Sequence, residues 1–229
     1  SLQPFDAPCL TDADRELRTS AAEVLTLFGA SAAPAIPVLL EALRSNDERL
    51  RSAAAAALGA TASPIILNPL VDVVQFDASP AVRDAAVTAI ARIGRPAVPT
   101  LVELLRDNDD EIRARATEGL RLIGPAAMAA VPDLKRSLGE VSPTVRLGAA
   151  EAIWAISSDA AASYPTAIAL LAEPDRTLRM RAHRLILTIG RTSAPPEMIA
   201  ELERLAVSRD PRVRQAAYIA LREIAQEQP

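Results

Sequence analysis

The chain has 229 residues and a formal net charge of −4, with 25 Lys and Arg against 29 Asp and Glu. Proteins bind nucleic acids largely through Lys and Arg contacts to phosphates, and this acidic balance offers no general basic surface, so we expect no nucleic-acid partner. No apolar run approaches the ~20 residues of a membrane span, so we also expect no membrane partner.

Residues 1–13 have the pattern of an incomplete first helix of a repeated unit, with Pro4, Pro8 and Leu10. This segment contains Cys9, the only cysteine of the chain, so no intrachain disulfide can form and the redox compartment stays open. A secretory signal is absent, which favours the cytoplasm. Because the chain begins with Ser1 rather than Met, the sequence leaves open whether a signal peptide or further repeats precede it.

Helical segments then follow one another with short connections and no long linker. Residues 14–28 form the first complete helix, and the helix that precedes Ser79 begins irregularly at Ser63-Pro64 and Asn68-Pro69. The other predicted helices span residues 36–43, 47–61, 79–94, 99–106, 109–123, 131–138, 142–156, 163–171, 175–189, 198–207 and 210–225. Half of the residues are hydrophobic but only 3% are aromatic, a composition that suits closely packed, Ala-rich helices.

The stretch from Ser79 to Arg106 shows the repeated unit most clearly: one helix runs from the Ser79 cap to Gly94, and another begins near Pro99. An aliphatic–Arg pair near the start of the first of these helices recurs along the whole chain. The pairs are Leu17-Arg18, Leu50-Arg51, Val82-Arg83, Ile112-Arg113, Val145-Arg146, Leu178-Arg179 and Val213-Arg214. We call the second member the repeat Arg and number positions from it. Successive repeat Args lie 30 to 35 residues apart, a period typical of stacked helical repeats.

Other positions recur in register with the repeat Arg. Position −4 is always Asp or Ser, which are good N-cap residues. Position +3 is always Ala, and position +7 is always Leu or Ile. Position +11 is a glycine in four repeats, as expected where a helix ends, namely Gly29, Gly94, Gly124 and Gly190.

This pattern resembles the HEAT repeat family in its bacterial HEAT-like form, whose helices read PxLxxLL and VRxxAaxAL. The segment Pro99–Leu105, followed by Ile112-Arg113 and Leu120, carries both parts. The resemblance covers nearly the whole chain. It implies an all-α fold, a right-handed superhelical solenoid of stacked antiparallel helix pairs, forming a single domain over residues 1–229 with about seven units and an incomplete first repeat at 1–13.

The family also places an acid at position −6, giving an acid–Arg ladder between repeats. The acids here are Asp12, Asp77, Asp107, Glu140 and Glu173. Ser45 and Ser208 depart from this pattern. We therefore expect Arg51, which lacks the acid at its own position −6, to stabilise the fold less than Arg113.

Catalytic patterns are missing from the sequence. His183 is the only histidine, so a His-based metal cluster cannot form, and we interpret it as a surface imidazole. Cys9 has no nearby histidine, and no GxGxxG, Walker or GxSxG motif occurs. The acidic run 107–111 lacks the spacing and glycine of an EF-hand and is interpreted as a turn with Asp109 as its cap. We expect no enzyme activity, no cofactor and no metal.

The resemblance implies that the VRxxAaxAL helices line the concave surface. At 100° per residue, positions +1, +5 and +8 point away from the helix-pair core. In the first repeats these positions are mostly small and polar, whereas the last three present large apolar side chains there. The predicted partner-binding residues are Arg121, Leu147, Trp154, Met180, Arg184, Leu187, Ile219 and Arg222. Exposed apolar clusters often mark interaction sites. The alternatives are that superhelical curvature packs these side chains on neighbouring repeats, or that they cover the last helices as a cap.

We therefore expect a non-catalytic scaffold that binds a protein or peptide on its concave face as a module of a larger assembly. The alternative is an enzyme-accessory subunit of the bilin lyase type, which also contains HEAT-like repeats. A HEAT-like DNA glycosylase is disfavoured, because such enzymes use a basic channel with aromatic residues. HEAT-like deoxyhypusine hydroxylases hold iron through repeated His-Glu pairs, which a single histidine excludes. Partner identity and oligomeric state are not determined by the sequence.

Overall fold

The computed structural model describes residues 14–226, which form helices and short connections with no strand among them. The α-helices are α1 (Arg15–Phe28), α2 (Ile36–Ala42), α3 (Glu48–Thr61), α4 (Leu67–Phe76), α5 (Pro80–Ile93), α6 (Val98–Leu104), α7 (Asp110–Ile123), α8 (Val131–Ser137), α9 (Pro143–Ser157), α10 (Ala160–Ala169), α11 (Arg176–Thr192), α12 (Pro196–Leu205) and α13 (Pro211–Gln226). Short 3-10 helices are η2 (Gly29–Ala35), η3 (Pro64–Ile66), η4 (Arg95–Ala97), η5 (Gly124–Ala130) and η6 (Leu170–Ala172).

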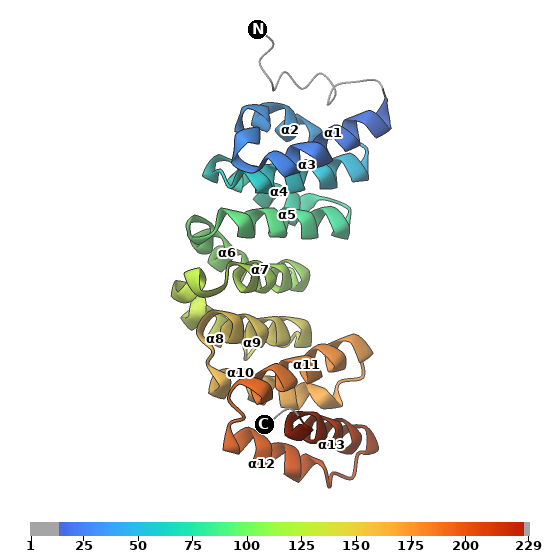
Figure 1. The fold of residues 1–229 in the computed structure, drawn as a ribbon, viewed down its shortest axis with the longest axis vertical. Coiled ribbons are helices and arrows are strands. Elements are labelled where there is room, and N and C mark those ends of the chain that lie inside the picture. The colour runs from blue at the N-terminus through green and yellow to red at the C-terminus, as the bar shows by residue number, and fades with distance from the viewer. Residues whose placement is uncertain (1–13, 227–229) are drawn as a thin grey trace.

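The helices form antiparallel pairs that stack from one end of the molecule to the other (Figure 1). A shorter first helix (α2, α4, α6, α8, α10 or α12) precedes each longer second helix from α3 to α13. This confirms the predicted all-α solenoid of stacked helix pairs. The predicted partial helix in residues 1–13 lies outside the described residues, and the assignment of one domain over the whole chain stays a prediction.

The predicted caps define where the second helices begin. The side chains of Asp14, Asp47, Ser79, Asp109 and Asp175 accept hydrogen bonds from backbone N–H groups of the following first turn. This satisfies donors that have no partner within the helix. The local sequence therefore sets the start of each of these helices, and with it the rotational phase of the side chains that follow.

Small residues allow neighbouring second helices to approach closely. A Cβ atom on Gly59 of α3 would lie 2.5 Å from the Cα of Ala89 in α5, and a Cβ on Gly148 of α9 would lie 2.1 Å from Oγ1 of Thr117 in α7. Real Cβ atoms do not approach that closely, so larger residues at these glycines would push the repeats apart. The stacking distance thus requires small residues at these contacts.

The buried side chains divide into two clusters that meet at α9. Ile153 and Ile156 belong to the N-terminal cluster, whereas Leu147 and Ala150 belong to the C-terminal one. Because its residues belong to both clusters, helix α9 packs on both sides, and its exposed surface is correspondingly small.

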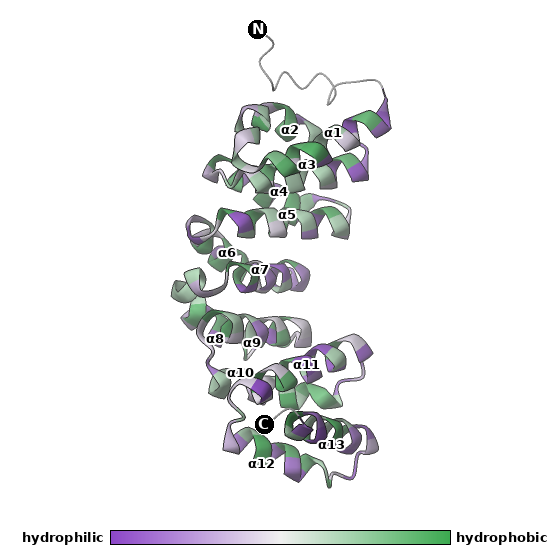
Figure 2. Cartoon of the chain, viewed as in Figure 1, coloured by the Kyte–Doolittle hydropathy of each residue, from purple (hydrophilic) through white to green (hydrophobic). Residues whose placement is uncertain are grey.

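The helices also differ in composition, since α7, α11 and α13 carry many hydrophilic residues, drawn purple in Figure 2.

One apolar stretch is longer than the sequence analysis recognised. By length and composition alone, the continuous helical stretch Arg15–Ala42, which contains an 18-residue window with a mean hydropathy of 1.6, could cross a membrane. In the fold it is not one straight helix, because Gly29 has a φ of 55° at the end of α1 and a 3-10 segment separates α1 from α2. Leu25 and Leu39 in this stretch are buried in the N-terminal cluster. The expectation of no membrane partner stays a prediction.

The repeat Arg joins the two helices of its own repeat. In five repeats its Nη1 donates to the backbone carbonyl at position −6, in the turn between the first and second helices. The donor–acceptor pairs are Arg51–Ser45, Arg113–Asp107, Arg146–Glu140, Arg179–Glu173 and Arg214–Ser208, at 2.7–3.0 Å. Any residue at position −6 provides this carbonyl, so the two serines there do not disrupt the turn.

In two repeats the acid that pairs with the repeat Arg comes from position −6 of the following repeat. Arg51 donates to both carboxylate oxygens of Asp77, at 2.7 and 2.9 Å, although Asp77 stands at position −6 of Arg83. Arg113 donates to one carboxylate oxygen of Glu140, at 3.4 Å, and also to Asp110 of its own repeat. The expectation that Arg51 lacks a ladder acid is therefore wrong, because the ladder is shifted by one repeat. Arg179 forms no carboxylate contact among the described residues, and neither does Arg146, although Glu173 stands at position −6 of the repeat that follows Arg146.

We predict that Arg51→Ala destabilises the protein more than Arg179→Ala. Removing Arg51 leaves Asp77, only 7% exposed, without its guanidinium, and losing one partner of a buried pair costs about 3 kcal/mol. Removing Arg179 loses carbonyl hydrogen bonds worth about 1 kcal/mol. Urea unfolding followed by circular dichroism measures both losses. Equal losses would contradict the shifted ladder.

A second link joins the first two described repeats and makes stability depend on pH. Hydrogen bonds from Arg15 to the carboxylate of Asp47, one of them 2.7 Å long, lower the pKa of Asp47 from 3.8 to about 2. A carboxylate with a lowered pKa stabilises the fold above its unfolded pKa and loses that contribution as pH falls through its folded pKa. The stabilisation is therefore complete above about pH 4 and is lost towards pH 2.

We predict that Asp47→Asn reduces the loss of unfolding free energy between pH 4 and pH 2, because it removes this titration. Asparagine is also a good N-cap, so the start of α3 is retained in this variant. Urea unfolding at a series of pH values gives the slope for both proteins. The same slope in the variant and the unsubstituted protein would contradict the assignment of this titration to Asp47.

Candidate partner-binding groove

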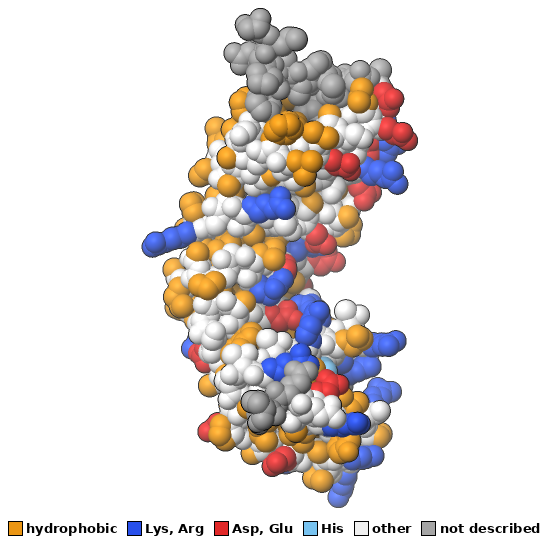
Figure 3. Space-filling model, viewed as in Figure 1, with side chains coloured by type: hydrophobic (Ala, Val, Ile, Leu, Met, Phe, Trp, Pro, Cys, Tyr) orange, Lys and Arg blue, Asp and Glu red, His pale blue; other side chains and the backbone are white. Residues whose placement is uncertain are grey.

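A groove of about 870 Å³ runs across four consecutive second helices, α5, α7, α9 and α11. In the space-filling view the molecule is hollowed on its right side at the level of α7 and α9 (Figure 3). Because these helices share one register, the groove is lined by the same positions in each repeat. Lining residues at positions +1, +5 and +8 include Asp84, Glu118, Arg121, Glu151, Trp154 and Arg184.

The predicted partner-binding residues do not all lie in the groove. Arg121, Trp154 and Arg184 line it. On α11, Met180 is 61% exposed and Leu187 is half-buried, but neither contributes to the lining. The same holds on α13, where Ile219 is half-buried and Arg222 is exposed.

The expectation that Leu147 faces a partner is wrong, because its side chain is 0% exposed. Its side chain belongs to the C-terminal core cluster together with Leu171 and Leu178. At α9, residues of the following repeat cover position +1, which therefore does not point into the solvent. The alternative that superhelical curvature packs these side chains on neighbouring repeats is therefore correct for Leu147.

Ion pairs at the α5–α7 end of the groove connect the two helices. Arg115 of α7 donates to Asp84 of α5 at 2.8 Å and to Glu111 at 3.1 Å, and Arg83 of α5 also reaches Glu111, at 3.2 Å. Arg115 is only 13% exposed, whereas Asp84 and Glu111 are 65% and 64% exposed. At this end the carboxylates therefore face the solvent and the guanidiniums lie beneath them.

The burial is reversed at the α9–α11 end. Arg181 of α11 donates to Glu151 of α9 at 2.7 Å, and here the carboxylate is the more buried partner, at 14% against 28%. Arg184 is exposed, and its side chain forms no hydrogen bond or ion pair within residues 14–226. Arg121, between the two ends, donates to both oxygens of Glu118 at 2.6 and 2.7 Å, a contact that raises the pKa of its guanidinium.

Trp154 lies between these two charged ends. The side chain projects from α9, packs partly on the C-terminal core cluster and is half-buried. The groove therefore presents one aromatic surface flanked by charged side chains. Arg115 and Arg181, both at position +2, were missed by the sequence analysis. Each could have been found from an acid in the preceding repeat: Asp84 pairs with Arg115, and Glu151 pairs with Arg181.

His183 lies outside the groove lining and is half-buried, not on the surface as expected. Its imidazole contacts Glu223 of α13 at 3.5 Å. Burial lowers the pKa of His183, partly offset by the charge of Glu223. Within residues 14–226, no group of three or more His, Cys, Asp and Glu residues could hold a metal ion.

A model of the HEAT repeats family matches residues 7–77, 67–154 and 101–184. No curated protein sequence matches the chain significantly. Among solved structures, an archaeal HEAT-like repeats protein from Thermococcus onnurineus NA1 is similar, with a TM-score of 0.52 and 15% identity over 90% of this chain and 93% of that one. The complex of CpcE and CpcF of phycocyanin lyase from Nostoc sp. PCC7120 gives a TM-score of 0.54 and 19% identity over 69% and 99%. Human deoxyhypusine hydroxylase in complex with glycerol gives a TM-score of 0.41 and 22% identity, over 95% of this chain and 82% of that one.

We predict that Leu147→Ala destabilises the protein more than Trp154→Ala. The fully buried Leu147 leaves a cavity, and such substitutions cost about 2–5 kcal/mol. The half-buried Trp154 loses less than the 3–5 kcal/mol of a fully buried aromatic residue, about 1–2 kcal/mol. Urea unfolding of both variants measures the difference. A larger loss for Trp154→Ala would place the indole in the core and remove it from the groove.

Proposed function

The chain belongs to the HEAT repeat family, and on this premise we propose that it is a non-catalytic scaffold that binds a protein or peptide segment along the groove of α5, α7, α9 and α11. The observation that carries the proposal is the half-buried Trp154 at the centre of an open groove, between two charged ends. Binding hot spots are enriched in Trp and Arg and lie near the centre of an interface. Trp154, Arg121 and Arg184 fit that description.

The chemistry of the lining favours a polypeptide over a small apolar ligand. Small-molecule sites are mostly apolar with few polar groups. This groove is lined by nine charged side chains on four helices, among them Asp84, Glu118, Arg181 and Arg184. A polypeptide can provide opposite charges along its length. We therefore propose a protein or peptide partner, in the setting of a larger assembly.

A non-catalytic role is supported by the pairing of the groove residues. The lining acids Glu111, Glu118 and Glu151 each hold an arginine, and the lining contains no histidine or cysteine to act as base or nucleophile. The lining hydroxyls, such as Thr88 and Ser142, thus have no general base of that kind among their neighbours.

One observation favours a second candidate function. The fold is similar to the CpcE and CpcF complex of phycocyanin lyase over 99% of that chain, although 19% identity shows the fold alone. An accessory subunit of the bilin lyase type would use the same groove for an open-chain tetrapyrrole. Quenching of Trp154 fluorescence by such a compound at micromolar concentration would favour this candidate over the scaffold.

The proposal is tested by selecting peptides from a displayed library of random 12-residue sequences on the immobilised chain. We expect enriched peptides whose affinity falls about thirty-fold or more in Trp154→Ala, as loss of an anchor worth ≥ ~2 kcal/mol requires. Thr19→Ala on α1, outside the groove, is the matched control and should bind as the unsubstituted chain does. The proposal fails when no peptide is enriched, or when binding is insensitive to Trp154→Ala.

A further inference from the structure

We propose that the groove selects a polypeptide segment by the order of its charges: a basic residue over the α5–α7 end, an apolar side chain on Trp154, and an acidic residue at α11. This inference rests on the proposed function and adds the chemistry of the partner. The lining as a whole is close to neutral, so its net charge does not select a ligand. The inference follows from which member of each ion pair faces the solvent.

At the α5–α7 end, the solvent-facing members are acids. Asp84 and Glu111 are each about two-thirds exposed, whereas Arg115, which pairs with both, is 13% exposed. Arg83 beneath Glu111 is 18% exposed. A partner approaching this end meets carboxylates first, because the compensating guanidiniums lie deeper in the protein.

At the α9–α11 end, the solvent-facing members are arginines. Glu151 lies beneath Arg181, and Arg184 extends the positive surface by one helical turn without a carboxylate partner within the described residues. Helix α11 carries five arginines and no Asp or Glu, so no acid of its own offsets them. The two ends of the groove therefore present opposite charges to a ligand.

Distance makes this difference effective. Coulomb energy falls with separation, so the charge that a ligand contacts directly outweighs the opposite charge that lies behind it. A bound segment therefore interacts mainly with the outer charge of each pair. Complementary charges fix the register of a partner and suppress partners with the wrong order.

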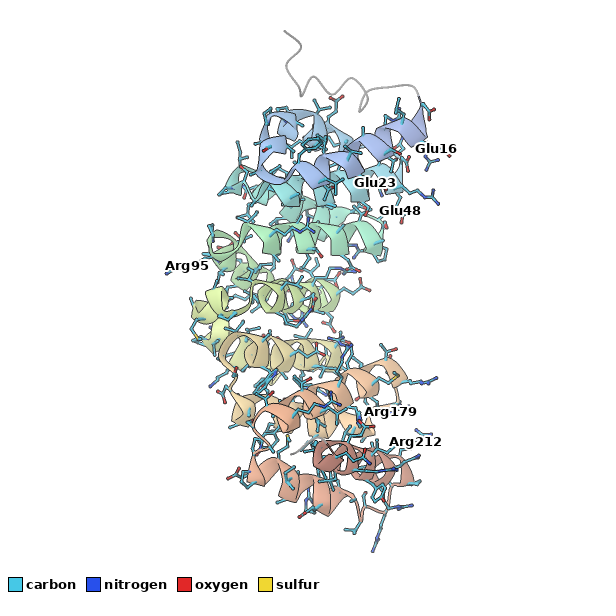
Figure 4. The ribbon with its side chains drawn as sticks, viewed as in Figure 1. Glu16, Glu23, Glu48, Arg95, Arg179 and Arg212 are labelled. Carbon is cyan, nitrogen blue, oxygen red and sulfur yellow. The ribbon has the colours of Figure 1, made fainter. Side chains whose placement is uncertain are left out.

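Beyond the groove the first repeats carry exposed charges of both signs, since Arg15, 66% exposed, is the outer member of its pair with Asp47. Exposed acids, including Glu16, Glu23 and Glu48, lie on the first repeats, whereas Arg179 and Arg212 lie on the last repeats along the same side of the solenoid (Figure 4). Basic side chains also gather at the lower right edge of the space-filling view (Figure 3). A nucleic acid carries one uniform sign of charge, so the acidic end would repel it, whereas a polypeptide can match both ends.

The test repeats the peptide selection on Arg184→Glu and compares it with the unsubstituted chain. Because Arg184 is exposed and unpaired within the described residues, the variant should keep its melting temperature. We expect peptides selected by the unsubstituted chain to carry a basic residue towards one end, an apolar residue between, and an acid towards the other. Their affinity should fall about tenfold or more in Arg184→Glu, and replacing the peptide acid with Lys should restore it.

Arg95→Glu is the matched control. It makes the same change of net charge at an exposed arginine on the opposite side of the solenoid (Figure 4) and should leave peptide affinity unchanged. Selected peptides without charge order, or equal affinity in Arg184→Glu, would overturn the inference. If those peptides still depended on Trp154, the proposed function would stand and only the charge order would fail. An equal loss of peptide affinity in Arg95→Glu would show that only the net charge of the protein matters, and it would also overturn the inference.

Discussion

The hydrogen bond from the repeat Arg to the carbonyl at position −6 is the contact on which the arrangement of the solenoid depends. It ties each of five second helices to the turn that precedes it, as Arg51 does with Ser45 and Arg179 with Glu173. The acceptor is a backbone atom, so the contact tolerates any side chain at position −6. In α7, α9 and α11 this hydrogen bond fixes the second helix relative to its preceding turn, and these three helices line the groove together with α5.

Close stacking determines what that groove can contain. Gly59 and Gly148 let neighbouring second helices approach to distances at which no Cβ would fit, so large side chains are confined to positions that point away from the contact. Long charged side chains on those positions then span adjacent repeats, as Arg115 does to Asp84 and Arg181 to Glu151. The ion pairs of the groove are thus a consequence of the short spacing between repeats.

The contrast between Leu147 and Trp154 shows how a small change of packing alters the surface. Both belong to α9, and the repeat register places both on outward positions. Leu147 is covered by the repeat that follows and joins the C-terminal core, whereas Trp154, two turns later, keeps part of its indole in the groove. The two core clusters meet at this helix, and Trp154 is the one aromatic side chain in the groove lining.

The sequence by itself determined the helix starts, the repeat register and the family, because caps, glycine stops and the repeat Arg are local signals that seven copies reinforce. It also indicated Arg121, Trp154 and Arg184, which line the groove. Only the tertiary structure decided that Leu147 is buried, that Asp77 pairs with Arg51, and which member of each ion pair faces the solvent. These depend on how one repeat is rotated against the next, and that rotation arises from contacts between side chains about 30 residues apart, which no single repeat encodes.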